Sequence, residues 1–282
     1  MAGERGPYGA FRGGRGGPRR ERPTGRDGSP AEGREGPAPV RGRELRIHGL
    51  NAVLAVFRHR PADLRKLYLA EERIPALKAL LKWCVANRVG YRVVPEDDLR
   101  KLAASSHHEG VVADVRRVEP ASLETWLAAL PEGRACLLWL DGVGNPHNLG
   151  AILRSAAHFG VGAVLLPAGS ELGLSGAAAR VAEGGAEAVP MVRLPGAPLA
   201  MEALRAAGFT LAATVVEGGE GLFEAALPER LVYVLGAEGE GMDRGLAARC
   251  DLQLSIPGTG AVESLNVAAA TAVLLAAWAA AR

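Results

Sequence analysis

A series of short apolar segments after residue 135 constrains the fold of this chain more than any other feature. Runs such as Cys136–Leu140 and Leu231–Leu235 are apolar throughout, as expected of parallel strands covered by helices on both faces. The expected strands are 136–140, 163–166, 188–192, 210–215, 231–235 and 252–256, and the expected helices are 151–159, 176–183, 199–207, 242–248 and 267–281. This alternation predicts an α/β domain whose ligands bind outside the carboxyl ends of a parallel sheet.

The region before this domain predicts a second, smaller unit. Residues 44–118 alternate helical patterns, such as Asn51–Phe57, with short strands, such as Val111–Val115, and therefore predict a compact α/β fold. Residues 119–134 carry prolines near both ends and are predicted to be a linker between the two domains. A chain of 282 residues, 48% of them hydrophobic, can bury the cores of two such domains.

The first 43 residues form a tail of Gly, Pro and Arg, with ten Arg against five acidic residues. Such a segment cannot bury enough apolar surface to offset its ordering entropy, so we expect it to be disordered. One hypothesis is an electrostatic arm for RNA, because Arg binds phosphate and stacks on bases. The other is a tail that only improves solubility. The tail carries a net charge of 10 − 5 = +5, whereas the formal net charge of the whole chain is only +2, so the basic character belongs to this tail.

The cysteines and histidines give no sign of a disulfide framework or a metal site. Cys84, Cys136 and Cys250 are widely spaced, which favours free thiols in a reducing cytoplasm. The stretch 105–110 contains two adjacent His and a Glu, but neighbours on an extended chain point to opposite faces, so we expect a polar turn. The apolar run Val267–Ala281 is too short for a bilayer span. We therefore expect neither a bound metal nor a membrane anchor.

Three loops that follow expected strands are rich in glycine and polar residues. They are Asp141–Gly150, Gly236–Gly241 and the stretch Ile256–Asn266. None has the glycine order of a dinucleotide fold or a Walker phosphate loop. Composition and spacing alone therefore predict an α/β ligand-binding domain and leave its ligand open.

The three loops together resemble the three motifs of the SpoU (TrmH-type) branch of the SPOUT RNA methyltransferases. Asn148–Ala156 resembles the first motif, Leu235–Gly241 the second and Ile256–Val267 the third. The resemblance covers 135–282, and 44–118 resembles the small RNA-binding domain that precedes many ribosomal RNA members. One departure is Gly258, where many members carry Met or Leu, which predicts a looser cofactor loop.

The resemblance implies a fold and a cofactor that the residues alone do not. The fold is a parallel sheet with a C-terminal trefoil knot, whose loops hold S-adenosylmethionine mainly through backbone groups. The positions that match the family's cofactor site are Thr214, Gly236, Ile256 and Leu265. The family is dimeric, so we expect a homodimer whose interface includes the Ala-rich C-terminal helix.

The resemblance also implies the catalytic residues. Arg154 matches the arginine that activates a ribose 2′-hydroxyl, and it needs help from RNA phosphate or another proton acceptor, because arginine stays protonated. The residues that would orient it and the ribose are Asn148, Glu238, Ser264 and Asn266. Taken singly, each residue can be explained by an ordinary structural role. Asn148, Ser264 and Asn266 could simply cap helices, Glu238 could belong to a turn, and Arg154 could form a surface ion pair.

The leading hypothesis is therefore an S-adenosylmethionine-dependent ribose 2′-O-methyltransferase that acts on RNA. Ribosomal RNA is favoured over transfer RNA, because 44–118 resembles the extra domain of the ribosomal RNA enzymes. A transfer RNA methyltransferase is one alternative, and a non-catalytic RNA-binding or ribosome assembly factor is another. A small-molecule nucleotide-binding enzyme is a further class, which predicts cofactor binding without affinity for RNA.

Overall fold

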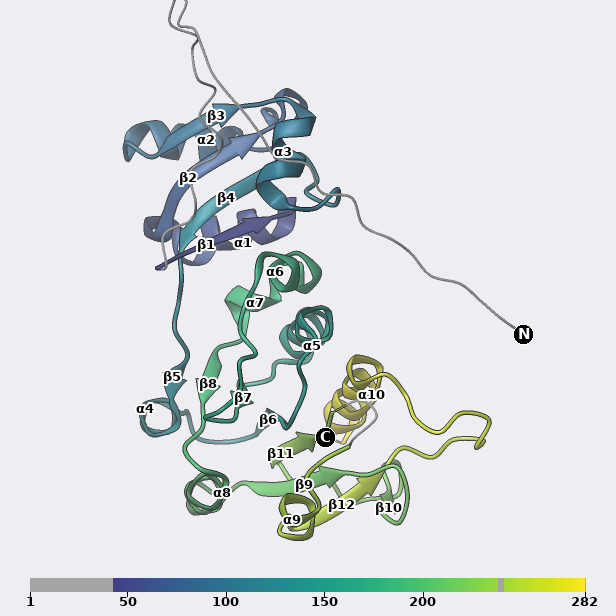
Figure 1. Ribbon diagram of the computed structural model, residues 1–282. Helices are drawn as coiled ribbons and strands as arrows, with labels where there is room; N and C mark the ends of the chain where they lie inside the picture. The colour runs from purple at the N-terminus through teal and green to yellow at the C-terminus, as the bar shows by residue number, and fades with distance from the viewer. Residues whose placement is uncertain (1–42, 238–240, 282) are drawn as a thin grey trace, which may run out of the picture. The chain divides into compact units, whose positions relative to one another are not determined.

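The structure is a computed structural model that describes residues 43–237 and 241–281 (Figure 1). All of these residues belong to one compact unit. The expected disordered tail, apart from Arg43, lies outside the described residues, as does Glu238.

The larger sheet has eight strands in the order β10-β12-β9-β11-β6-β7-β8-β5 (Figure 1). Every pairing in it is parallel, as the apolar strands predict. The strands are Ala121–Ser122 (β5), Ala135–Leu140 (β6), Ala163–Leu166 (β7), Met191–Arg193 (β8), Thr210–Thr214 (β9), Glu220–Gly221 (β10), Arg230–Leu235 (β11) and Leu252–Ser255 (β12). β6 and β11 pair over their full length at the centre, so the carboxyl ends of these two strands lie side by side.

Helices cover both faces of this sheet. One face carries Pro146–Phe159 (α5), Gly176–Ala182 (α6), Gly185–Ala188 (α7) and Val267–Ala280 (α10). The other carries Leu123–Ala128 (α4), Ala197–Ala206 (α8) and Arg244–Ala248 (α9). Gly150 lets α5 approach α6, because an added Cβ would lie 2.6 Å from the carbonyl oxygen of Ala178. Within the described ranges, no helix has both the length and the apolar character needed to cross a membrane.

The smaller sheet has four strands in the order β1-β4-β2-β3. They are Glu44–His48 (β1), Leu64–Leu69 (β2), Gly90–Val93 (β3) and Val111–Arg116 (β4), with β2 and β3 parallel and the other pairs antiparallel. One face packs against Leu50–His59 (α1) and Lys78–Ala86 (α2), and the other against Glu96–Ala103 (α3). Two short 3₁₀ turns, Pro61–Asp63 (η1) and Glu71–Arg73 (η2), complete this small α/β unit.

Ion pairs join the smaller unit to the helices α6 and α7. Arg60 Nε lies 2.5 Å from the Glu187 carboxylate, and Arg180 Nη2 lies 2.6 Å from that of Glu109. The side chains of Arg60 and Glu187 are largely buried, so this contact has little solvent screening. Because α6 and α7 also pack on α5, the ion pairs connect the smaller unit to the helix that carries the first motif.

The structure differs from the expected elements at several points. The expected linker contains α4 and β5, and β5 pairs with β8 in the larger sheet. β1 is not among the expected strands, although its alternating polar and apolar residues are typical of a half-buried strand, and it pairs with β4. The expected strand 188–192 begins at Met191 and is preceded by α7. Strand order does not test the knot, which stays a prediction.

Candidate active site

Three of the four expected cofactor residues, Thr214, Gly236 and Ile256, lie at the carboxyl edge of the larger sheet, where β9, β11 and β12 end as close neighbours. At Gly236 an added Cβ would lie 2.4 Å from the backbone nitrogen of Met242 and 2.5 Å from the carbonyl carbon of Gly241. Ala237 and Gly241 exchange two backbone hydrogen bonds of 2.9 and 3.0 Å. The loop thus closes on itself, and only glycine fits at its entrance.

Two further positions share this edge. The Thr214 hydroxyl donates to the Val234 carbonyl oxygen over 2.9 Å, which fixes the end of β9 against β11. Ile256 follows β12 and packs, half-buried, against the main core. A ligand at this edge would therefore meet backbone groups on a rigid base, while the Thr214 hydroxyl is engaged within the sheet.

The first and third motifs meet through their asparagines. Asn266 Nδ2 donates to Asn148 Oδ1 over 3.2 Å, and the two residues are 118 positions apart in the chain. Asn148 is buried near the start of α5. Asn266 caps α10, since its Oδ1 accepts from the backbone N–H groups of Ala268 and Ala269 at 2.9 and 3.3 Å.

These contacts show that Asn266 caps a helix and that Asn148 does not. Asn145 caps α5, with its Oδ1 accepting from the His147 N–H at 2.9 Å, so capping is not the role of Asn148. Asn148 Oδ1 is occupied by Asn266, which leaves the Asn148 amide N–H groups to donate elsewhere. Among the described residues, none accepts from them.

Arg154 lies on a different face of α5 from Asn148. Six positions along an ideal helix correspond to about 240° of rotation. The Arg154 side chain is exposed and lines a cavity of about 490 Å³ together with Asn51 and Glu183. Within the part of the chain that the structure describes, it forms no hydrogen bond or ion pair. The described chain therefore brings Asn148 and Asn266 together and leaves Arg154 apart from them.

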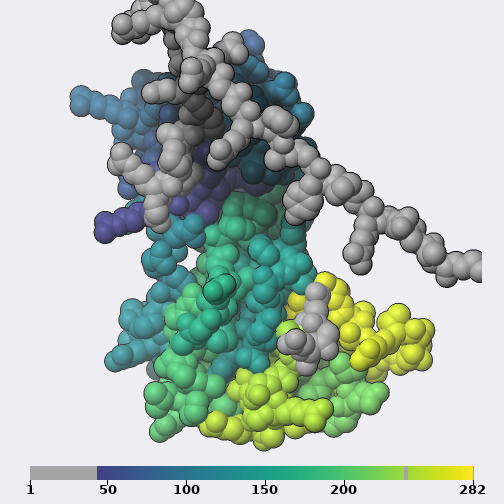
Figure 2. Space-filling model, viewed as in Figure 1, coloured from purple at the N-terminus to yellow at the C-terminus, as the bar shows by residue number. Residues whose placement is uncertain are grey.

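The remaining motif residues lie on an exposed loop. Residues 257–266 are exposed throughout and project beside α10 (Figures 1 and 2). Ser264 and Leu265 belong to this loop, and Leu265 retains 47% of its accessible surface. No hydrogen bond joins either one to Thr214, Gly236 or Asn148 among the described residues. Glu238 is not described, so its predicted role is not tested.

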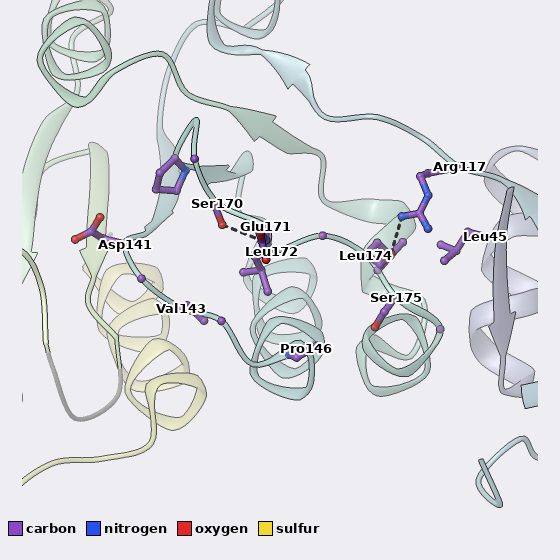
Figure 3. Close-up of a pocket in the computed structure, with 16 residues that line it drawn as sticks. Leu45, Arg117, Asp141, Val143, Pro146, Ser170, Glu171, Leu172, Leu174 and Ser175 are labelled. Atoms are coloured by element: carbon purple, nitrogen blue, oxygen red, sulfur yellow. Dashed lines mark hydrogen bonds between the residues drawn. The ribbon is translucent and has the colours of Figure 1, made fainter. Parts of the chain in front are cut away.

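The sequence does not predict a further polar hollow, which lies at the carboxyl edge of the larger sheet. It has a volume of about 820 Å³ and lies over the loops that follow β6 and β7, with Asp141 at one end and Arg117 at the other (Figure 3). The only signal in the sequence was the run of glycines in 169–176, which alone predicts no more than a turn.

The site offers no cluster suited to a metal. In residues 43–237 and 241–281, no group of three His, Cys, Asp or Glu could hold one. The Gly236 loop does suit a cofactor held by backbone groups, because it presents close-packed main chain with no room for a Cβ. S-adenosylmethionine is a ligand of this kind in the family that the motifs resemble.

Family comparisons agree with these motifs. Residues 135–276 match the SpoU rRNA methylase family, and 46–121 match a domain described as RNA 2′-O ribose methyltransferase substrate binding. The uncharacterized tRNA/rRNA methyltransferase YfiF of Escherichia coli O157:H7 is 38% identical over 84% of this chain and 68% of its own length. The 23S rRNA (guanosine-2′-O-)-methyltransferase RlmB of Bordetella pertussis is 38% identical over 81% of this chain and 94% of its own.

A solved structure shares the fold. The SpoU methyltransferase AviRb of Streptomyces viridochromogenes, in complex with AdoMet, aligns with a TM-score of 0.70 and 25% identity, covering 85% of this chain and 91% of its own. The likeness therefore extends over both the smaller unit and the larger sheet. The chain belongs to the SpoU (TrmH-type) family of S-adenosylmethionine-dependent RNA 2′-O-ribose methyltransferases.

Proposed function

We propose that this chain methylates a ribose 2′-hydroxyl of ribosomal RNA. The observation that carries the proposal is the contact between Asn148 and Asn266, which unites the first and third family motifs at the sheet edge that also carries Gly236. RlmB relatives act on 23S rRNA by name, and the match over 46–121 describes a substrate-binding domain. A transfer RNA substrate is the alternative within the same chemistry.

The reaction requires the 2′-oxygen to lie in line with a methyl group, and positioning provides much of the rate. Bound S-adenosylmethionine supplies an electrophilic methyl group. Asn148 Nδ2 would donate to the ribose and hold it in place, while Asn266 fixes the Asn148 amide in the orientation that exposes this donor. Glu238 and Ser264 would orient the same ribose.

Arg154 would bind RNA phosphate next to the reacting sugar. Its guanidinium stays protonated, so it acts as a positive charge and the hydroxyl proton leaves to a phosphate oxygen or water. Thr214, Gly236, Ile256 and Leu265 are the residues we propose for cofactor binding, mainly through their backbone groups.

We propose that the working form is a homodimer. Arg154 lies on a different face of α5 from Asn148, so a second copy of the chain could bring an arginine to the paired asparagines. An exposed face of α10 that includes Ala276, together with the exposed side chain of Val262, offers an apolar surface for that copy.

The remaining proposals concern organisation. We propose an arm at 1–43, a substrate domain at 44–118, a linker at 119–134 and a methyltransferase domain at 135–282, in a cytoplasmic protein. If the arm binds phosphate, its deletion should weaken RNA binding and flatten the salt dependence of that binding.

The thiols fit a reducing compartment. Burial raises the pKa of Cys84 to about 11. Burial together with the Asp251 charge raises the pKa of Cys250 to about 11 as well, so both thiols stay protonated and unreactive at neutral pH.

The test is transfer of labelled methyl from S-adenosylmethionine to total RNA from cells that lack the gene, followed by mapping of the modified ribose. One methylated ribose in ribosomal RNA, lost with Arg154→Ala, supports the proposal. Label on transfer RNA alone supports the alternative. Cofactor binding without label on free RNA or on precursor ribosomal particles would contradict both and favour an assembly factor.

A further inference from the structure

The hollow at the carboxyl ends of β6 and β7, here called the β6–β7 groove, forms a continuous path along the sheet edge. Its walls are the loops 141–146 and 167–176, and Leu45 and Arg117 of the smaller unit close one end. Figure 3 shows Asp141 at the opposite end, with Ser170, Glu171 and Leu172 between them. A volume of about 820 Å³ lies in the range of sites that enclose small molecules.

The groove is built on fixed loops. Leu172 is buried in the main core and anchors the loop after β7. Arg193 Nη1 donates to the carbonyl oxygens of Pro167 and Ser170 at 2.9 Å each. Arg117 Nη1 donates to the Leu174 carbonyl oxygen at 3.2 Å. These contacts hold the walls before any ligand arrives, which lowers the entropic cost of binding.

One end of the groove adjoins the candidate cofactor loop. The Asp141 carboxylate accepts from the Asp243 N–H at 3.3 Å, and an added Cβ on Gly142 would lie 3.1 Å from the Ala237 Cβ. Ala237 and Asp243 flank the loop that follows Gly236. A ligand lying in the groove would therefore run from the smaller unit to the edge where the methyl group is delivered.

The charges in the groove are ordered along its length. Arg117 lies at the end formed by the smaller unit, and the carboxylates of Glu171 and Asp141 lie in the middle and at the cofactor end. Within the described residues, Glu171 is exposed and has no hydrogen-bond or ion-pair partner. Carboxylates repel phosphate and accept hydrogen bonds from amino groups of bases, so the middle suits a base and the Arg117 end suits phosphate.

We infer that the β6–β7 groove binds the single-stranded RNA segment that carries the target nucleotide, with an amino-bearing base against Glu171 and a flanking phosphate at Arg117. The inference rests on the proposed RNA methylation and specifies where its substrate lies. Sequence-specific recognition of RNA commonly uses unstacked bases of single strands, which a groove of this volume can accommodate. Uracil has no exocyclic amino group, so it would lose that contact and could offer Glu171 only its ring N3–H.

Glycines in the groove allow a test that leaves the fold intact. At Gly144 and Gly173 an added Cβ meets nothing within 4 Å, and neither residue has a positive φ. Gly144→Leu and Gly173→Leu should therefore fill the groove without strain. Gly196 has the same freedom but lies outside the groove, so Gly196→Leu is the matched control.

The measurement is fluorescence anisotropy of labelled RNA pentamers, with S-adenosylmethionine binding by calorimetry and thermal unfolding as checks. Each groove variant should weaken pentamer binding by about tenfold or more, with cofactor affinity unchanged and Gly196→Leu like wild type. Pentamer binding within twofold of wild type in both folded groove variants would overturn the inference. Because binding is measured without catalysis, failure of the methylation proposal would appear separately, as bound RNA that gains no label.

A second binding experiment tests the contact between Glu171 and the base. The wild-type chain should bind pentamers of A or C more tightly than pentamers of U, and Glu171→Ala should remove that preference. Glu202 is an exposed carboxylate on α8 outside the groove, so Glu202→Ala should keep it. A preference that survives Glu171→Ala would overturn the assignment of the base to this residue.

Discussion

At Gly236 the backbone after β11 approaches the returning loop so closely that a single methyl group has no room. Gly258, on the loop after β12, has no atom within 4 Å of an added Cβ. Both glycines belong to family motifs, yet only one is required by packing. The resemblance already sets Gly258 apart, because many family members carry Met or Leu there, and the structure adds that Gly236 has no room for any larger residue.

We expect Gly236→Ala to abolish S-adenosylmethionine binding, because the added Cβ forces the loop open. Overpacking of this kind should also cost about 1–3 kcal/mol of stability. Gly258→Ala should bind the cofactor as wild type does. Calorimetric titration with S-adenosylmethionine decides between them, and equal affinities for the two variants would contradict the proposed cradle.

We expect Asn266→Asp to keep the fold and lose activity. The carboxylate still caps α10, so the melting temperature should change little. It cannot donate to Asn148 Oδ1, so the Asn148 amide is no longer held and methyl transfer should fall by about 10²-fold.

The control for this variant is Ser122→Asp at the cap of α4, a cap that touches no motif residue. It should retain full activity. If Asn266→Asp were as active as wild type, the paired asparagines would have only a structural role.

Among the elements, α6 and α7 contact both α5 and the smaller unit. They pack on α5, which carries the first motif, and they bind the smaller unit through Arg60–Glu187 and Arg180–Glu109. Glu109 adopts a left-handed backbone conformation with φ of 53°, and its carboxylate also accepts from the Leu50 N–H at 2.8 Å. Glu109 therefore caps α1 and binds α6 from a strained backbone conformation, which indicates a specific contact between these two helices.

We expect Glu187→Gln to destabilise the protein by about 1.5–3 kcal/mol, because it weakens charged hydrogen bonds to a largely buried Arg60. The matched control is Asp97→Asn in the exposed pair with Arg100, which should stay within about 0.5 kcal/mol of wild type. Urea unfolding measures both. A Glu187→Gln change as small as the control would show that the contact contributes little.

His48, at the end of β1, makes the same region sensitive to pH. Burial, followed by the charge of Arg180, lowers the pKa of His48 below its ordinary value of 6.5. The folded state therefore binds fewer protons than the unfolded state, so this contribution to stability is complete above about pH 6.5 and is lost as the pH falls. We expect His48→Gln to flatten the decrease in unfolding free energy between pH 7.5 and 5. An unchanged slope would exclude His48 as the cause.

At the scale of the whole molecule, the described part of one chain does not bring all the predicted catalytic residues together. The described chain unites Asn148 with Asn266 but leaves Arg154 exposed on another face of α5. We expect Ala276→Arg, on the exposed face of α10, to convert a dimer to a monomer and to lower activity, since the site would lack the second copy. Light scattering after size exclusion gives the mass, and Ala129→Arg at another exposed alanine is the control. A wild-type monomer with full activity would contradict the dimer.

The sequence alone determined the parallel sheet, because strands covered on both faces need apolar residues throughout, as β6 and β11 have. It also gave the smaller α/β unit and the three motif loops, since each follows a local pattern of strand, turn and helix. It did not give β5 or β10, each of two residues, because such short strands exist only through pairing with β8 and β12.

Only the tertiary structure decided which residues meet. Asn148 reaches Asn266 because packing brings the start of α10 to the start of α5, and the order of strands in a sheet is a long-range property that no local pattern records. The separation of Arg154 from Asn148 is different, because it follows from helical rotation within α5 alone, once the helix includes both residues. The groove between Asp141 and Arg117 has the same origin as the asparagine contact, since loops far apart in sequence share a wall only after β6 and β7 pair and the smaller unit packs beside them.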